Sequence, residues 1–143
     1  MSWLQTQVKE NPQKRFIKEG EQAFSYIEIS QMVQVYIKAF LQEGIQPRDR
    51  ILIYLPGGIQ MVEIILCCFE IGAIATPISR KLTKSERDAV IKIIKPRLII
   101  TNWSEKDALG SVSYPLSCIE ELPDSSGGCS ILINKYEHNF FKN

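Results

Sequence analysis

A continuous run of apolar residues from Ile51 to Leu55 constrains the fold of this chain more than any other feature. Arg50 precedes the run, and Pro56-Gly57-Gly58 follows it. A strand with water on one face alternates apolar and polar residues, whereas a run without alternation is typical of a strand covered on both faces. The sequence therefore predicts a mostly parallel sheet that lies between layers of helices, which is an α/β fold.

Helical patterns lie on both sides of this run. Ser25 and Glu28 form an S-x-x-E capping box, and apolar residues then repeat at helical spacing as far as Leu41. A second helix is predicted from about Ile59 to Ile71. Apolar residues lie nearly all round this second helix, which predicts that it is buried on more than one side by further protein.

The rest of the chain continues the alternation of helices and strands. The other predicted elements are a helix over 3–11, a hairpin over 15–24, strands over 73–78, 97–101 and 131–133, a helix after the Thr83–Glu86 capping box, and a short helix over 105–109 capped by Ser104. Residues 110–130 are rich in turn formers. Strands that alternate with helices favour right-handed βαβ units and a parallel sheet.

Composition excludes several classes of protein. A chain of 143 residues with a net charge of +1 suits one domain, and no basic block indicates nucleic-acid binding. No apolar run is long enough for a membrane span, and the N-terminus has no apolar core of a secretion signal. The four cysteines, Cys67, Cys68, Cys118 and Cys129, form no C-x-x-C pair, and the sequence contains a single histidine, His138. We expect reduced thiols, no zinc site and a cytoplasmic location.

Three segments are candidates for chemistry, and each has a simpler structural reading. Pro56-Gly57-Gly58 joins a strand to a helix, so it is either an anion site or a tight turn, and the absence of a known phosphate-loop pattern favours the turn. Arg80-Lys81 follows a strand end and is either an anion contact or a surface turn. Glu63 and Glu70 lie on one helix, where a solvated or ion-paired stripe is favoured over paired-carboxylate chemistry. We assign no catalytic, cofactor-binding or metal-binding residue.

Six segments in order resemble the N-terminal region of the adenylate-forming (AMP-binding) acyl-CoA synthetases. They are residues 24–29 (Phe-Ser-Tyr-Ile-Glu-Ile), 44–51 (Gly-Ile-Gln-Pro-Arg-Asp-Arg-Ile), 55–56 (Leu-Pro), 69–79 (Phe-Glu-Ile-Gly-Ala-Ile-Ala-Thr-Pro-Ile-Ser), 81–83 (Lys-Leu-Thr) and 97–101 (Arg-Leu-Ile-Ile-Thr). Arg48 stands where the family prefers Gly, and Gly57-Gly58 replace its usual Asn-Ser. Trp3-Leu4 and Lys81-Leu82-Thr83 are similar to the o-succinylbenzoate–CoA ligases within this family.

The resemblance implies a two-step ligase that uses ATP, Mg and CoA. In such an enzyme a carboxylic acid substrate is first activated to an acyl-adenylate and then transferred to CoA. The family's phosphate loop should follow a strand like 131–133, but Asn134-Lys135-Tyr136 do not match it. The resemblance therefore implies an N-terminal α/β portion over 1–133, a partial N-terminal subdomain of the adenylate-forming fold, with an unstructured tail over 134–143. No cofactor is expected to bind this chain alone.

These expectations lead to two functional hypotheses. The first is a truncated acyl-CoA synthetase-like ligase that is inactive by itself, as a broken or frameshifted gene would produce. The second is a non-catalytic α/β interaction module, or one half of a split ligase that a C-terminal fragment completes. The apolar helix over 59–71 also predicts self-association.

Overall fold

A computed structural model describes residues 1–122 of the chain. The helices are α1 (Trp3–Glu10), α2 (Tyr26–Gln42), α3 (Ile59–Ile71), α4 (Lys84–Ile94) and α5 (Trp103–Leu109). The strands are β1 (Arg15–Glu19), β2 (Gln22–Ser25), β3 (Arg50–Ile53), β4 (Ile74–Pro77), β5 (Leu98–Thr101) and β6 (Leu116–Cys118). The predicted strand over 131–133, the tail over 134–143, and Cys129 and His138 lie outside the described residues.

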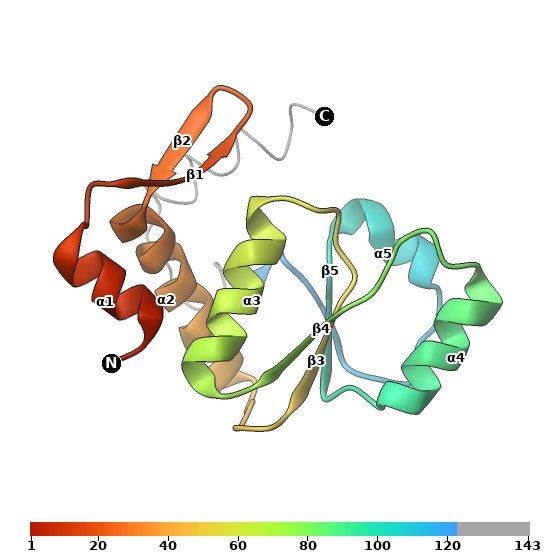
Figure 1. The fold of residues 1–143 in the computed structure, drawn as a ribbon. Helices are drawn as coiled ribbons and strands as arrows, with labels where there is room; N and C mark the ends of the chain where they lie inside the picture. The colour runs from red at the N-terminus through yellow and green to blue at the C-terminus, as the bar shows by residue number, and fades with distance from the viewer. Residues whose placement is uncertain (123–143) are drawn as a thin grey trace.

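The core of the fold is a four-stranded parallel sheet with the order β4-β3-β5-β6 (Figure 1). Helices α2 and α3 cover one face, and α4 and α5 cover the other. Alternate residues of β3 point to the two faces: Ile51 and Ile53 join the core under α2 and α3, whereas Leu52 packs in the smaller core under α4. The predicted burial of this strand on both faces, and the α/β fold class, are confirmed.

The N-terminal segment forms an antiparallel hairpin of β1 and β2 beside α1. Ser25 ends this hairpin and caps α2, and its hydroxyl accepts from the Glu28 amide at 3.3 Å, as the capping box predicts. The rings of Phe16 and Tyr26 are stacked 4.6 Å apart, and Trp3 meets Phe16 edge-on at 5.6 Å. These aromatic contacts fix α1 and the hairpin on the N-terminal end of α2.

The strand β6 lies within the segment 110–130, which was predicted to be rich in turns and in which no strand was expected. It pairs in parallel with β5, with Leu116 opposite Ile99 and Cys118 opposite Thr101. A strand of three residues has too little pattern to stand out between turn formers such as Pro115. Ile119 and Leu122 beyond it are buried in the core under α2 and α3.

One further prediction about a helix is wrong. The N-cap of α5 is Asn102, whose side chain accepts from the Glu105 amide at 2.8 Å, so Ser104 lies inside the helix and does not cap it. In α4 the buried residues are Arg87 and Ile91, and Ile93 is 80% exposed. No helix within residues 1–122 is long and apolar enough to cross a membrane. Cys67, Cys68 and Cys118 are buried and free.

Candidate functional site

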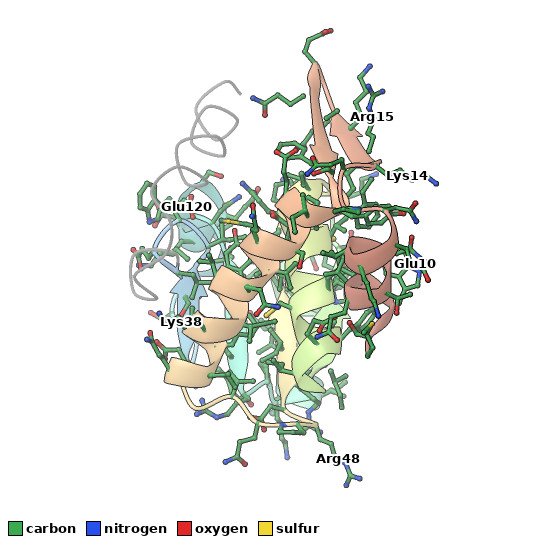
Figure 2. All side chains as sticks on the ribbon, turned by 90° about the vertical axis from the view of Figure 1, so that its left-hand side faces the viewer. Glu10, Lys14, Arg15, Lys38, Arg48 and Glu120 are labelled. Carbon is green, nitrogen blue, oxygen red and sulfur yellow. The ribbon has the colours of Figure 1, made fainter. Side chains whose placement is uncertain are left out.

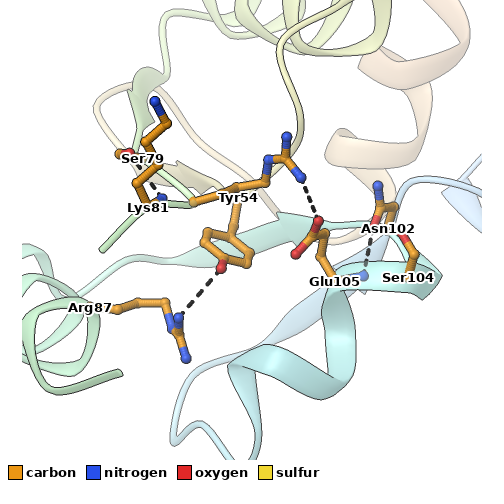
Figure 3. A network of polar contacts seen from close by, with 8 residues as sticks. Tyr54, Ser79, Lys81, Arg87, Asn102, Ser104 and Glu105 are labelled. Atoms are coloured by element: carbon orange, nitrogen blue, oxygen red, sulfur yellow. Dashed lines mark hydrogen bonds and ion pairs between the residues drawn. The ribbon is translucent and has the colours of Figure 1, made fainter. Parts of the chain in front are cut away.

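The carboxyl ends of the parallel strands define the place where a site is expected. The chain passes from β3 to β4 in one direction and then returns across β3 to β5, so the direction of winding reverses between β3 and β5. Ligands of open α/β sheets bind in the crevice at such a reversal. Tyr54 follows β3, Ser79 and Arg80 lie beyond β4, and Asn102 follows β5. These residues surround the candidate site (Figure 3).

A buried arginine holds the site together from one side. Arg87 of α4 is 6% exposed, and its guanidinium lies 5.5 Å from the centre of the Tyr54 ring. Its Nη1 donates to the Tyr54 hydroxyl at 3.4 Å (Figure 3). Its Nη2 donates to the Ala108 carbonyl at 2.5 Å. The carbonyl groups at a helix C-terminus carry partial negative charge, so the last turn of α5 stabilises this buried cation. The contacts of Arg87 therefore stabilise the tertiary structure.

Arg80 also forms an ion pair within the chain. Its Nη1 lies 2.7 Å from Oε1 of Glu105 on α5, and the Lys81 amide next to it donates to the Ser79 hydroxyl at 3.1 Å. An arginine already paired with a carboxylate is a poor ligand for a second anion, because that anion would meet the carboxylate charge. The geometry therefore favours the surface-turn reading of Arg80-Lys81 over an anion contact.

The Gly57-Gly58 turn at the start of α3 faces a carboxylate of the hairpin. A Cβ atom built on Gly58 would lie 2.9 Å from Oε1 of Glu19, so this carboxylate stands at the N-terminal end of the helix. No side chain caps α3. The negative charge of the Glu19 carboxylate interacts favourably with the positive N-terminal end of the α3 dipole. The same charge would repel a phosphate from this position. The tight-turn reading therefore suits this segment better than an anion site.

A hollow of about 340 Å³ lies between the hairpin and the beginning of α3. Its walls are formed mainly by apolar side chains, with one basic and one acidic residue among them. The lining residues are Phe16, Ile17, Lys18, Glu19, Gly58, Ile59 and Val62. The hollow is apolar and open, and it lies beside α3 rather than at the β3–β5 crevice.

The interface of α2 and α3 contains a buried carboxylate, although the sequence favoured a solvated or ion-paired stripe for Glu63 and Glu70. Glu63 of α3 is 0% exposed, and so is Tyr36 of α2. Burial raises the pKa of the Tyr36 phenol well above its usual 10.0, and the negative charges of Glu63 and Glu120 raise it further. Glu70, the other member of the predicted stripe, accepts from Gln5 Nε2 at 3.3 Å. The two carboxylates therefore do not form a solvated stripe, and they belong to two different contacts.

Two arginines near the crevice already have partners within the chain. Within residues 1–122 no three His, Cys, Asp or Glu side chains gather in a group that could hold a metal ion. Arg80 is paired with Glu105, and Arg87 contacts Tyr54 and Ala108.

Comparison with known proteins places the chain in a family. The sequence profile of the AMP-binding enzymes matches residues 4–137. The 2-succinylbenzoate–CoA ligase of Oceanobacillus iheyensis is 29% identical over 105 residues, which are 73% of this chain and 22% of that protein. The 4-coumarate–CoA ligase 2 of Nicotiana tabacum is 24% identical over 124 residues, which are 84% of this chain and 23% of that protein. The chain thus spans about a fifth of the length of the curated relatives it matches.

A solved structure shows the same fold. The o-succinylbenzoate coenzyme A synthetase of Bacillus subtilis, in complex with ATP and a magnesium ion, superposes with a TM-score of 0.80 at 18% identity. The match covers 85% of this chain and 33% of that one. The chain therefore belongs to the AMP-binding enzyme family, and its parallel sheet with flanking helices corresponds to part of the N-terminal subdomain of an adenylation domain.

Proposed function

We propose that this chain forms the first α/β portion of an adenylate-forming acid–CoA ligase and that it does not activate a carboxylic acid by itself. The observation that carries the proposal is the match of the family profile to residues 4–137, which cover only about a fifth of the related ligases. In the complete ligase the reaction would join a carboxylate to AMP from ATP and then to CoA. This chain would contribute a rigid layer on which the remaining parts fold.

The side chains at the carboxyl edge of the sheet support the second half of the proposal. Acyl-adenylate formation needs charged groups placed to stabilise the phosphates as negative charge shifts between their oxygens. Arg80 and Arg87 both lie near the crevice, and both already contact other groups of the chain. Their contacts stabilise the fold, so neither of these two side chains is free to bind a nucleotide.

Release of pyrophosphate tests the proposal directly. The purified chain is mixed with ATP, Mg²⁺ and, in separate reactions, o-succinylbenzoate, 4-coumarate and a short-chain fatty acid, with and without CoA. We expect no acid-dependent pyrophosphate above the rate without protein. The complete Bacillus subtilis synthetase with o-succinylbenzoate serves as the positive control. Acid-dependent release by the chain alone would show that it holds a working site.

The identity of the acid is a finer part of the proposal. Trp3-Leu4 and Lys81-Leu82-Thr83 resemble o-succinylbenzoate–CoA ligases, and a 2-succinylbenzoate–CoA ligase is among the relatives. These similarities make o-succinylbenzoate the first acid to test in a completed enzyme. We also propose a cytoplasmic location, because the described cysteines are free thiols buried in the core.

A non-catalytic interaction module, or one half of a split ligase, is the second candidate. The observation that favours it is the side chain of Phe69 on α3, which is apolar and 67% exposed. An exposed aromatic side chain suits contact with another protein. Pyrophosphate release that appears only when a C-terminal ligase fragment is added would favour the split ligase, and binding of a partner without any release would favour the module.

A further inference from the structure

One end of the parallel sheet gathers the starts of its strands and the ends of its helices. The helices between parallel strands run back against the strand direction, so β3, β4 and β5 begin where α2, α3 and α4 finish. Figure 1 shows these chain segments together at the lower end of the molecule. We call residues 41–50, 69–74 and 92–97 the amino end. It lies opposite the crevice at the carboxyl ends of β3 and β5.

The amino end carries five exposed basic side chains from two distant segments of the chain. They are Arg48, Arg50, Lys92, Lys95 and Arg97. The Arg97 amide donates to the Arg50 carbonyl at 2.8 Å, which brings the two segments side by side. The two ion pairs found within residues 1–122 involve none of these five cations. The fold therefore assembles a basic surface that no basic block in the sequence indicates.

Three carboxylates share the amino end with these cations. They are Glu43, Asp49 and Glu70. Asp49 accepts from the Gln46 amide at 2.7 Å, and Glu70 accepts from a glutamine of α1 at 3.3 Å. Arg97 Nη2 donates to the main-chain carbonyl of Glu43 at 3.1 Å, so this contact leaves the guanidinium charge without a carboxylate partner. Positive charges outnumber negative ones here, and they are accessible to an anion outside the chain.

Two of the cations occupy backbone conformations that favour glycine. Arg48 has φ of 73° and Lys95 has φ of 50°, and no other residue with a side chain within residues 1–122 has a positive φ. A Cβ atom makes this conformation unfavourable. Strained backbone of this kind is typical of positions where the side chain has a role. Both strained positions carry a positive charge, and both lie at the amino end.

Large apolar side chains project from the same end of the molecule. Leu41, Phe69, Ile74 and Ile93 are between 48% and 80% exposed. Three of them lie in the last turns of α2, α3 and α4, and Ile74 begins β4. The partial negative charge at helix C-termini would stabilise nearby cations in any fold of this class, but it gives no reason for exposed apolar groups. The amino end therefore combines cations with apolar side chains.

This combination distinguishes between classes of partner. A nucleic acid stacks its bases on aromatic side chains, and Phe69 is the single aromatic residue of the amino end. A soluble acidic segment would match the cations alone. An anionic lipid bilayer matches both kinds of side chain, because its headgroups attract lysine and arginine and its interface receives apolar groups.

We propose that the amino end is a docking surface for an anionic lipid bilayer. The five cations contact the anionic headgroups, and the four exposed apolar side chains enter the interface between headgroups and acyl chains. Binding of this kind is peripheral and weakens as salt screens the charges. The inference is independent of the proposed function, because the surface lies at the opposite end of the sheet from the crevice.

Sedimentation with lipid vesicles tests the surface. The full 143-residue chain is mixed with vesicles of phosphatidylcholine that contain phosphatidylserine as the minor component, and with vesicles of phosphatidylcholine alone. A tube without vesicles corrects for sedimentation of the chain itself. We expect binding to the vesicles with phosphatidylserine at low ionic strength, and much weaker binding to phosphatidylcholine alone.

Two double variants that remove the same charge locate the surface. Arg48→Gly with Lys95→Gly should bind the anionic vesicles at least about tenfold more weakly, because each cation near such a bilayer strengthens binding about fivefold. Glycine suits both backbone conformations, so urea denaturation should show no loss of stability. The control, Lys14→Gln with Arg15→Gln, changes exposed cations far from Arg48, as Figure 2 shows, and should alter binding by about twofold or less.

A third double variant tests the apolar part of the surface. Phe69→Gln with Ile93→Gln keeps every charge and should weaken vesicle binding at low and at high salt, because burial of apolar groups is not screened. Both side chains are exposed, so circular dichroism should show an unchanged fold.

Three results would overturn the proposal. The first is an absence of binding to the anionic vesicles at low ionic strength. The second is equal weakening by the two charge variants, which would mean that net charge alone decides. The third is vesicle binding that Phe69→Gln with Ile93→Gln leaves unchanged. If polyglutamate then binds the chain and Arg48→Gly with Lys95→Gly weakens that binding, the partner is an acidic protein and not a bilayer.

Discussion

The guanidinium of Arg87 lies over the ring of Tyr54, 5.5 Å from its centre, and donates to the hydroxyl of the same tyrosine at 3.4 Å. Through Nη2 the same side chain reaches the carbonyl of Ala108. One residue of α4 therefore connects the end of β3 with the last turn of α5. The smaller core under α4 contains few buried residues, among them Leu52, Ile91 and Leu109. We infer that this face of the sheet depends on the arginine for its cohesion.

Replacing Arg87 should therefore destabilise the fold. We expect Arg87→Met to lower the free energy of unfolding by about 2 kcal/mol, because it removes hydrogen bonds to a charged group from a buried position. Urea denaturation followed by circular dichroism measures the change. Lys92→Met on the exposed side of the same helix is the control, with an expected effect within about 0.5 kcal/mol. Equal stability of the two variants would show that the Arg87 contacts are not important.

Much of the sheet could be predicted from the sequence, because its strands are marked by continuous apolar runs. Ile51–Leu55 and Leu98–Ile100 have no polar residue, and every residue of β5 is buried. The capping boxes Ser25–Glu28 and Thr83–Glu86 identified where α2 and α4 begin, because the spacing of the box shows which residue is the N-cap. In these places local chemistry and tertiary packing favour the same structure.

The remaining features depend on contacts that a local pattern does not contain. Glu63 was expected in a solvated or ion-paired stripe, because glutamate side chains are seldom buried, but it lies on the side of α3 that the sheet and α2 cover. The same helix was expected to be buried on more than one side, and most of its apolar side chains are buried or half-buried, whereas Phe69 is 67% exposed. Only the contacts with the other elements decide which side of this helix is covered.

The cap of α5 gives a direct test of one corrected prediction. Asn102 accepts from the Glu105 amide at 2.8 Å, and Ser104 only donates to the Asn102 side chain at 3.0 Å. We expect Asn102→Ala to lower the free energy of unfolding by about 1 kcal/mol, and Ser104→Ala to have a much smaller effect. Thermal denaturation of both variants measures the difference. A larger effect at Ser104 would restore the cap expected from the sequence.

Two glycines at the ends of α3 should respond differently to alanine. Gly72 has φ of 75° and lies against Pro47, whose Cβ would be 3.4 Å from an added Cβ. Gly58 has an extended backbone, and its near neighbour is the movable end of Glu19. We expect Gly72→Ala to cost about 1 kcal/mol and Gly58→Ala to stay within about 0.5 kcal/mol. Urea midpoints of the two variants decide, and a larger loss at Gly58 would mean that Glu19 cannot move.

Burial of the thiols on α3 predicts how stability changes at high pH. Burial raises the pKa of Cys68 from 9.0 to about 12, and burial together with Cys68 and Glu70 raises the pKa of Cys67 further. The folded state therefore binds these protons more tightly than the unfolded state does. Their contribution to stability is complete below pH 9.0, the value of the unfolded thiol, and is lost as the pH rises toward the folded pKa of about 12.

We expect the free energy of unfolding to fall above pH 9.0 by up to about 1.4 kcal/mol per pH unit for each buried thiol. Urea denaturation at a series of pH values measures the slope. Other groups also titrate there, so the double variant Cys67→Ala, Cys68→Ala is the matched control and should lose part of the slope. If the unmodified chain and the double variant have parallel profiles, these thiols are as accessible to solvent in the folded state as in the unfolded one, because only a difference in proton affinity between the two states can produce the slope.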